Sequence, residues 1–399
     1  MEKYKLINNT LGWIVCIIAS CVYLMTMEPT ASFWDCGEFI SSAYKLEVGH
    51  PPGAPFFMLT ANLFTQFASD PSTVAKMVNT MSALFSGLTI LFLFWSITHL
   101  AKKIVVEDAQ EITMGQTITI MGAGLVGALA YTFSDTFWFS AVEGEVYAYS
   151  SLFTALVFWL ILKWESVADA PHADRWIVLI AYLMGLSIGV HLLNLLCIPA
   201  IVLVYYYKKF PNPTMKGTLI ALLVSFVIIA LMMYGVVQGL VEICGYFELF
   251  FVNTLGMPYN SGVYVYVLVL AGVLIWSIWE TMRDEIHPLR LRISFLLSVI
   301  LIGIPFIGSG YVIAAILSIA LAAYLFMNKE LNLKLLNTIL ISLMVVVVGY
   351  SSYALTLIRA TADTPMNQNA PKDIFTLRTY LAREQYGQTP LLYGQTYVS

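Results

Sequence analysis

Charged residues are scarce in this sequence. Only 11% of its 399 residues are Asp, Glu, Lys or Arg, whereas 59% are hydrophobic, and the mean hydropathy is +0.79. This composition excludes an ordinary soluble domain and predicts an all-α polytopic membrane protein. The few basic residues form short clusters beside apolar runs, which argues against nucleic acid as a partner.

Metal and disulfide signatures are also lacking. The sequence has five cysteines and contains neither C-x-x-C nor H-E-x-x-H. Three cysteines lie within apolar runs and are expected to pack as small hydrophobic residues. No spacing rule supports a disulfide between the other two, Cys36 and Cys244. No cofactor is indicated with certainty, and a divalent cation bound by carboxylates stays open.

Long apolar runs dominate what is present, and they predict about eleven transmembrane helices. The runs lie near 11–27, 77–100, 117–134, 146–162, 176–191, 192–207, 218–237, 262–281, 293–308, 310–327 and 335–357. The pairs 176–207 and 293–327 are tight hairpins, so an error in the number of spans is expected there first. No internal repeat is visible, which weakens a transporter built from inverted repeats.

The positions of Lys and Arg predict the orientation of these spans. With a cytoplasmic N-terminus, most of the 20 basic residues fall on the inner side. The outer ones are Lys45, Lys76, Arg359, Lys372, Arg378 and Arg383. The first apolar run is then an uncleaved signal-anchor. The outward segments are 28–76, 135–145, 238–261 and 358–399.

Two domains are expected. Residues 1–357 form the transmembrane domain, and 358–399 are more polar and resemble the start of a soluble outer-face domain that stops early. Within the first outward loop, 28–76, the stretch HPPGAPFFMLTANLFTQFAS is apolar but shorter than a span, and its prolines suit a helix start. It is expected to form a helix at the membrane interface. Segment 238–261 is also expected to lie along the membrane surface.

Asp35 and Glu38 are the candidate catalytic residues. They lie in FWDCGEFISSAYKLEVGHPPG, between two apolar regions. In a helix, a spacing of three places both carboxylates on one face. A carboxylate beside apolar surface has a raised proton affinity and can act as a base. The alternative is that both acids only stabilise a helix N-terminus.

Glu143 and Glu145 lie in the second outward loop, close to Asp135. Either acid could hold an acceptor or a divalent cation near Asp35. On a helix, two acids one residue apart point in different directions, so one of them, preferably Glu145, is expected to face the first loop. The alternative is acidic capping of the span that begins near Tyr147.

Three further residues are candidates for substrate binding. His50 precedes Pro-Pro-Gly and could bind a phosphate or assist a metal; alternatively, it is a turn histidine bonded to the backbone. His191 lies between two spans, where a lone histidine is more often a packing residue. Arg359 follows the last span, at a depth that suits a lipid phosphate. Its alternative is an ordinary snorkelling arginine.

The stretch WDCGEFISSAYKLEVGHPPGAPFFML resembles the acidic-pair and A-H-P-P-G signature of a bacterial membrane family. That family is related to the eukaryotic transmembrane protein O-mannosyltransferase of plexin-type ectodomains. The stretches AVEGEVYAYSSLF and TYLAREQYGQTPLLYGQTYVS are similar to later parts of the same family. Gly49 stands where the signature has alanine, which is a minor departure.

The resemblance implies a GT-C (C-type) glycosyltransferase fold, with the catalytic acid in the first outward loop. It implies Asp35 as base and Glu38 as its partner, in an inverting hexosyltransferase of the bacterial inner membrane with a periplasmic active site. The implied partners are a polyprenyl-phosphate sugar, most naturally mannose, an exported protein acceptor with Ser or Thr hydroxyls, and membrane lipid. The alternatives are the same fold acting on a lipid or glycan, and a transporter or flippase.

Overall fold

The computed structural model describes residues 2–106, 111–307, 311–328 and 330–387. It is 78% helix, and the described residues contain no strand beyond one isolated bridge. Eight helices of the described part are long and apolar enough to cross a membrane. The predicted all-α polytopic architecture is therefore confirmed. The five cysteines are free.

The chain divides into two compact units. Unit 1 comprises Met1–Glu47, Ala54–Ala230 and Asn332–Tyr353. Unit 2 comprises Val48–Gly53, Leu231–Leu331 and Ala354–Ser399. Each unit thus combines segments that are distant in the sequence.

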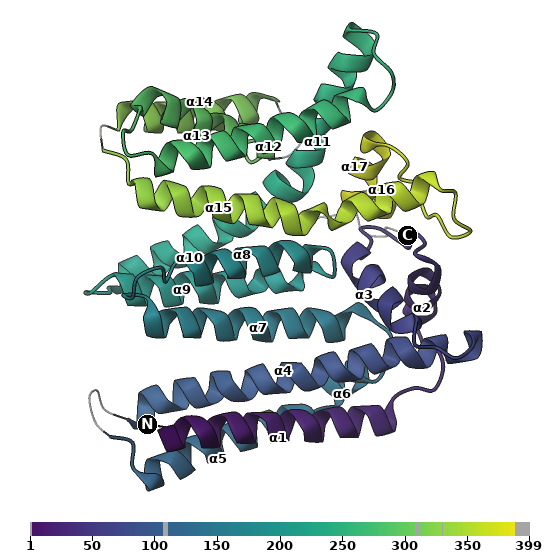
Figure 1. Cartoon of the computed structure of the whole chain (residues 1–399), viewed down its shortest axis with the longest axis vertical. Coiled ribbons are helices and arrows are strands. Elements are labelled where there is room, and N and C mark those ends of the chain that lie inside the picture. Colours follow the sequence, from purple (N-terminus) through teal and green to yellow (C-terminus); the bar gives the residue numbers. More distant parts are fainter. Residues whose placement is uncertain (1, 107–110, 308–310, 329, 388–399) are drawn as a thin grey trace, which may run out of the picture. The chain divides into compact units, whose positions relative to one another are not determined.

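Unit 1 is built on long helices that lie side by side, with α4 between α1 and α7 (Figure 1). Its longer helices are α1 (Glu2–Thr26), α4 (Val74–Val105), α5 (Met114–Thr132), α7 (Val146–Val167), α8 (Arg175–Ile188), α9 (Ile198–Lys209), α10 (Met215–Ala230) and α15 (Leu333–Tyr350). Its short elements are α2 (Cys36–Lys45), α3 (Pro55–Thr65), η1 (Pro71–Thr73), α6 (Asp135–Ala141), η2 (Leu192–Cys197) and η5 (Ser351–Tyr353). The short elements α2, α3 and α6 carry the two predicted outward loops.

Helices α8 and α15 approach each other through glycines. A Cβ on Gly185 would lie 2.5 Å from the Val346 carbonyl oxygen, and one on Gly349 would lie 2.5 Å from the Leu186 nitrogen. Small residues of this kind let two helix backbones come close, which is a common basis of helix packing in membranes. The glycines therefore attach residues 332–353 to helices that precede them by more than a hundred positions.

Unit 2 contains a helical stretch with two π-helical segments and several shorter helices. Its elements are η3 (Leu231–Gly239), α11 (Leu240–Leu249), η4 (Phe250–Thr254), α12 (Ser261–Met282), α13 (Pro288–Ile302), α14 (Tyr311–Met327), α16 (Ala354–Thr361), α17 (Ile374–Leu381) and η6 (Glu384–Tyr386). The helix does not stop at 237, the predicted end of a span, because helical structure continues through Thr254. Where this span ends in a membrane stays a prediction. The apolar stretch that suggested a surface segment at 238–261 is mostly α11 and η4.

The predicted number of spans exceeds the number of long helices. Three of the eleven predicted spans correspond to α8, α13 and α14, which have 14, 15 and 17 residues. At 1.5 Å per residue they extend roughly 21–26 Å, less than a bilayer core of about 30 Å. All three belong to the two hairpins where a miscount was expected. Residues 308–310, at the junction of the last two, lie outside the described residues.

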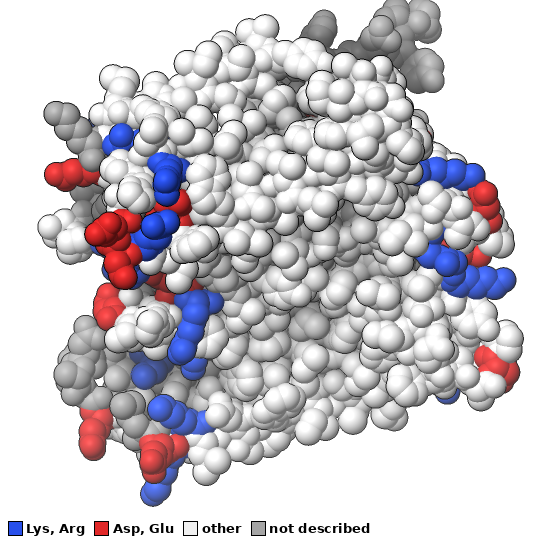
Figure 2. Space-filling view, turned by 45° about the horizontal axis from the view of Figure 1, so that its top comes forward, with Lys and Arg blue, Asp and Glu red and all other residues white. Residues whose placement is uncertain are grey.

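Large apolar side chains cover much of the surface. Helices α10 and α14 are apolar all round, and each buries only two side chains within the described structure. On the face shown in Figure 2, charged side chains gather at two edges and the surface between them is uncharged. A helix that is apolar all round and little buried by protein is expected to face lipid.

One end of unit 1 carries ion pairs. Glu165, near the end of α7, pairs with Lys103 and lies 3.6 Å from His99 Nε2, both near the end of α4. Asp169 lies 2.8 Å from Lys208 Nζ, and Asp174 lies 3.0 Å from Lys334 Nζ. These basic residues are among those predicted to be cytoplasmic, so the structure brings them to one end of unit 1. The side of the membrane stays a prediction.

Residues 354–387 pack within unit 2. They form α16, α17 and η6, and α17 contacts α11. The predicted domain boundary at 357/358 stays a prediction, and residues 388–399 of that segment lie outside the described residues.

Candidate functional site

Asp35 and Glu38 lie at the start of α2 in unit 1. Asp35 is the N-cap residue, with φ −84° and ψ −1°, and its carbonyl oxygen accepts the Phe39 N–H at 2.9 Å. The local backbone is thus helical, as predicted, and carboxylate oxygens of the two acids lie within 4.8 Å of each other. Asp35 is exposed and Glu38 half-buried. The predicted shared face is confirmed, and the catalytic role stays a prediction.

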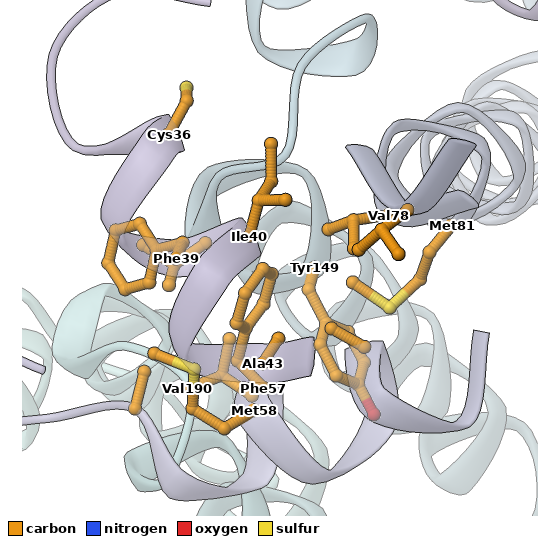
Figure 3. Close-up of a cluster of buried hydrophobic side chains, with 14 of the residues drawn as sticks. Cys36, Phe39, Ile40, Ala43, Phe57, Met58, Val78, Met81, Tyr149 and Val190 are labelled. Carbon is orange, nitrogen blue, oxygen red and sulfur yellow. The ribbon is translucent and has the colours of Figure 1, made fainter. Parts of the chain in front are cut away.

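The opposite face of α2 holds the helix in place. Cys36, Phe39, Ile40 and Ala43 are buried in a cluster with residues of α3, α4 and α7 and with Val190, and Figure 3 shows many of these side chains together. The rings of Phe39 and Phe57 meet edge to face with centroids 5.4 Å apart. Because α2 is apolar on this face and acidic on the other, burial of one face exposes the acids.

Helix α3 begins where the prolines predicted. Pro55 is its first residue, and the N–H groups of Phe56 and Phe57 donate to the Gly189 carbonyl at 2.8 and 3.3 Å. These amides cannot bond within the helix, so the turn after α8 supplies their acceptor. With 11 residues, α3 is too short to span, as expected. Its position in a membrane interface stays a prediction.

The second outward loop places Glu143 against the first. Glu143 is 4% exposed and Glu145 is 7% exposed. The side chains of Ser32 and Cys36, which flank Asp35 in the sequence, both hydrogen-bond to the Glu143 carboxylate. Burial raises the pKa of this carboxyl, and those two hydrogen bonds oppose the rise. Glu143 thus holds the chain on both sides of Asp35.

The preference for Glu145 as the acid that faces the first loop is wrong, because Glu143 makes the direct hydrogen bonds to Ser32 and Cys36. Residues 142–145 form bends and not a helix, so the helical geometry behind that expectation does not apply. Burial, followed by the nearby charges of Glu143 and Glu145, raises the pKa of the Cys36 thiol. Both acids therefore lie near Cys36, and Glu143 makes the direct contact. Glu145 occupies the N-cap position of α7 without a side-chain capping bond in the described residues. An acid at this position agrees with the capping alternative through the helix dipole, and its functional role stays a prediction.

Asn79 of α4 is a central residue that the sequence analysis missed. It is fully buried, and its Nδ2 donates to the carbonyl oxygens of Glu28 and Thr30 at 2.7 and 3.0 Å. The Glu28 N–H donates in turn to the Val142 carbonyl at 3.0 Å. A Cβ on Gly144 would lie 2.9 Å from Asn79 Oδ1. An asparagine inside an apolar run is the signal that could have identified it.

His191 lies beside Tyr147, the second residue of α7. The two ring centroids are 5.5 Å apart, and Tyr147 is close enough to Asp35 and Glu145 to interact with their charges. His191 Nδ1 accepts the Leu193 N–H at 3.2 Å and so caps η2. That bond is consistent with the packing alternative. The contact with Tyr147, which lies near Asp35, places His191 at the same end of unit 1 as α2.

His50 and Arg359 belong to unit 2. His50 lies in the turn 48–53, which contains a cis Pro51–Pro52 bond, and its carbonyl oxygen accepts the Gly53 N–H at 2.8 Å. Arg359 is half-buried in the last turn of α16. Of the predicted site residues, the structure of unit 1 brings together Asp35, Glu38, Glu143, Glu145 and His191. The roles of His50 and Arg359 stay predictions.

Comparison with known proteins gives a family match that begins at Asp35. Residues 35–214 match the family model described as the protein O-mannosyl-transferase TMEM260 N-terminal domain. The Dictyostelium discoideum protein O-mannosyl-transferase tmem260 is 26% identical over 196 residues, which cover 47% of this chain and 22% of that protein. The mouse protein O-mannosyl-transferase TMEM260 is 28% identical over 184 residues, covering 45% of this chain and 24% of the relative.

No solved structure matches the chain. The matched part spans less than a quarter of either curated relative. Over that part, the matches confirm the resemblance inferred from the acidic motif: this chain is related to the TMEM260 protein O-mannosyl-transferases.

Proposed function

We propose that this chain is an inverting glycosyltransferase. It moves a hexose, mannose in the first instance, from a polyprenyl-phosphate carrier to Ser or Thr hydroxyls of exported proteins. The observation that carries the proposal is the exposed Asp35 carboxylate, held next to Glu38 at the start of the segment that matches the relatives. Both relatives are named protein O-mannosyl-transferases.

In the proposed reaction, Asp35 removes the proton from the acceptor hydroxyl. The hydroxyl oxygen then bonds to the anomeric carbon, and the bond from that carbon to the phosphate oxygen breaks with inversion. The polyprenyl phosphate leaves with the bonding electron pair. An exposed carboxylate at a helix end can reach an acceptor, as a general base must. Glu38 orients the acceptor or a divalent cation, since hard oxygen donors suit such ions.

Other residues have supporting roles in this proposal. Glu143, which bonds to Ser32 and Cys36, fixes the backbone around Asp35. Glu145 and His191, near Tyr147, contribute to the acceptor side. His50 and Arg359 contact the phosphate of the donor, whose negative charge increases as it leaves. The protein is multi-pass in a bacterial inner membrane, with a cytoplasmic N-terminus and the α2 end of unit 1 in the periplasm.

Transfer by purified protein tests the proposal. Wild type is incubated with polyprenyl-phosphate mannose and a Ser/Thr-containing acceptor peptide, beside the Asp35→Asn variant. The proposal expects a glycosylated peptide from wild type and little from the variant. Undiminished transfer by Asp35→Asn would remove Asp35 as the base. Product in the lipid or glycan fraction alone would favour the alternative acceptor, and uptake into liposomes without product would favour a transporter. Loss of transfer on adding EDTA would show that a cation is needed.

A further inference from the structure

The turn that carries His50 is fastened to the C-terminal segment of the chain. The Val48 N–H donates to the Met366 carbonyl, and the Gln368 N–H donates to the Val48 carbonyl, each at 3.1 Å. These bonds make a parallel bridge between Val48 and Asn367. All of these residues belong to unit 2. One side of the turn is thus paired with backbone more than 300 positions later.

Tyr380 of α17 holds the other side of the turn. Its side chain is fully buried, and its hydroxyl lies 2.7 Å from the Gly49 carbonyl oxygen and 3.2 Å from that of His50. A Cβ on Gly53 would lie 2.6 Å from the same hydroxyl, and Gly53 has a φ of +74°. Only glycine suits this position without strain or collision. The Tyr380 phenol therefore contacts the turn on both sides of the two prolines: at Gly49 and His50 before them, and at Gly53 after them.

Helix α17 is itself held firmly. The Asp373 side chain accepts the N–H groups of Phe375 and Thr376, both at 2.9 Å, which caps the helix. Arg378 Nη2 lies 3.5 Å from an oxygen of Glu242, a carboxylate of α11 that is 8% exposed. The Arg378 side chain is 42% exposed, so solvent screens this pair and it adds only modestly to the contact of α17 with α11. Tyr380 thus projects from a helix with a defined position on α11.

We propose that α17 is a positioning element for the donor site, with Tyr380 as the residue that sets the place of His50. The inference rests on the proposed function, in which His50 contacts the donor phosphate. It goes beyond the comparisons, because residues 354–387 lie outside the matched segment 35–214. Through Tyr380, a segment late in the chain controls the affinity of the enzyme for its lipid-linked donor.

The main test is the Tyr380→Phe variant, which removes one oxygen atom. We expect the KM for polyprenyl-phosphate mannose to rise about tenfold, the equivalent of one lost hydrogen bond to a positioned group. The KM for the acceptor peptide and the melting temperature should stay close to wild type. Tyr386→Phe is the matched control, because Tyr386 is 51% exposed and should not affect either KM. An unchanged donor KM in Tyr380→Phe would overturn the proposal.

A double-mutant cycle separates positioning from general stabilisation. In a His50→Ala background, Tyr380→Phe should cause no further rise in the donor KM, because the group that it positions is gone. Additive effects would contradict a role through His50. Gly53→Ala should reproduce the rise, since its Cβ would collide with the Tyr380 hydroxyl.

Hydrogen exchange tests the inference apart from catalysis. Amides of peptides covering 46–56 should exchange faster in Tyr380→Phe than in wild type or Tyr386→Phe. Unchanged protection of these amides in Tyr380→Phe would show that the Tyr380 hydroxyl does not stabilise the turn 48–53. Absence of transfer by wild type, together with faster exchange in Tyr380→Phe, would refute the proposed function and keep the structural role of Tyr380.

Discussion

The acidic residues at the two ends of unit 1 have different partners. At the ends of α4 and α7, Glu165 pairs with Lys103, and nearby Asp169 pairs with Lys208. At the starts of the same helices, Glu143 is buried against a hydroxyl and a thiol, and within the described part of the chain no Lys or Arg forms an ion pair with it. The acids of the first end have lysine partners, whereas a buried acid without a cationic partner is costly, which makes Glu143 a candidate for a functional role.

From this difference between the two ends of unit 1, we predict that they face opposite sides of the membrane. In intact cells, a membrane-impermeant maleimide should label Ser41→Cys on α2 almost completely and Lys103→Cys on α4 hardly at all. Permeabilised cells should show labelling at both positions. Each substitution is made in a Cys21→Ser background, because Cys21 is the exposed native cysteine. The reverse pattern would place the acidic motif in the cytoplasm and end the proposal of a periplasmic site.

Substitution of one acid at each end should have very different effects on transfer. Asp35→Asn is expected to lower kcat/KM about 100-fold or more, the usual contribution of a general base. Asp169→Asn is the matched control, because Asp169 is exposed and pairs with lysines at the other end. Initial rates with a mannose donor and an acceptor peptide measure both. Equal losses in the two variants would show that the ends do not differ in function.

Glu143 should affect both rate and stability. Glu143→Gln is expected to lower kcat roughly tenfold by loosening the backbone around Asp35. The folded-state pKa of Glu143 lies above its ordinary value of 4.5. The folded protein therefore binds this proton more tightly than the unfolded chain does. The resulting stabilisation is fully present below the ordinary value and is lost as pH rises through the folded-state pKa.

Thermal unfolding of wild type and Glu143→Gln measures the second effect. The melting temperature of wild type relative to the variant should decline as the pH is raised from about 4 to 7. Glutamine does not titrate in this range, so the melting temperature of the Glu143→Gln variant is the baseline against which that of wild type is compared. A difference that stays constant across this range would show that burial does not perturb the carboxyl.

The smallest effect is expected from the ion pair at the other end. Lys103→Gln removes the partner of Glu165, and the Lys103 side chain is about half exposed. Pairs of this kind contribute about 0.2–1 kcal/mol to folding, so the free energy of unfolding should fall by that amount. Transfer activity should not change. A large loss of activity would link this end to the reaction.

The sequence predicted those features of the fold and site that depend on local pattern. Apolar runs located the helices, Pro55 marked the start of α3, and the spacing of Asp35 and Glu38 placed both on one face. The runs did not predict that the helix continues past 237 through Thr254, or that α8, α13 and α14 are short. Contacts between residues distant in the sequence could not be predicted. Nothing near Asn79 or Tyr380 in the sequence indicates which loop each side chain hydrogen-bonds to.

The glycine contact between α8 and α15 also bears on biosynthesis. Residues 1–230 leave the ribosome before Leu333–Tyr350 exist, so the Gly185 face of α8 is without its α15 partner until late in synthesis. A shortened chain that stops at 214, where the family match ends, would keep the acidic motif but lack this late helix. Such a fragment is expected to insert without reaching the native packing, and expression designs should therefore retain residues through at least Tyr353.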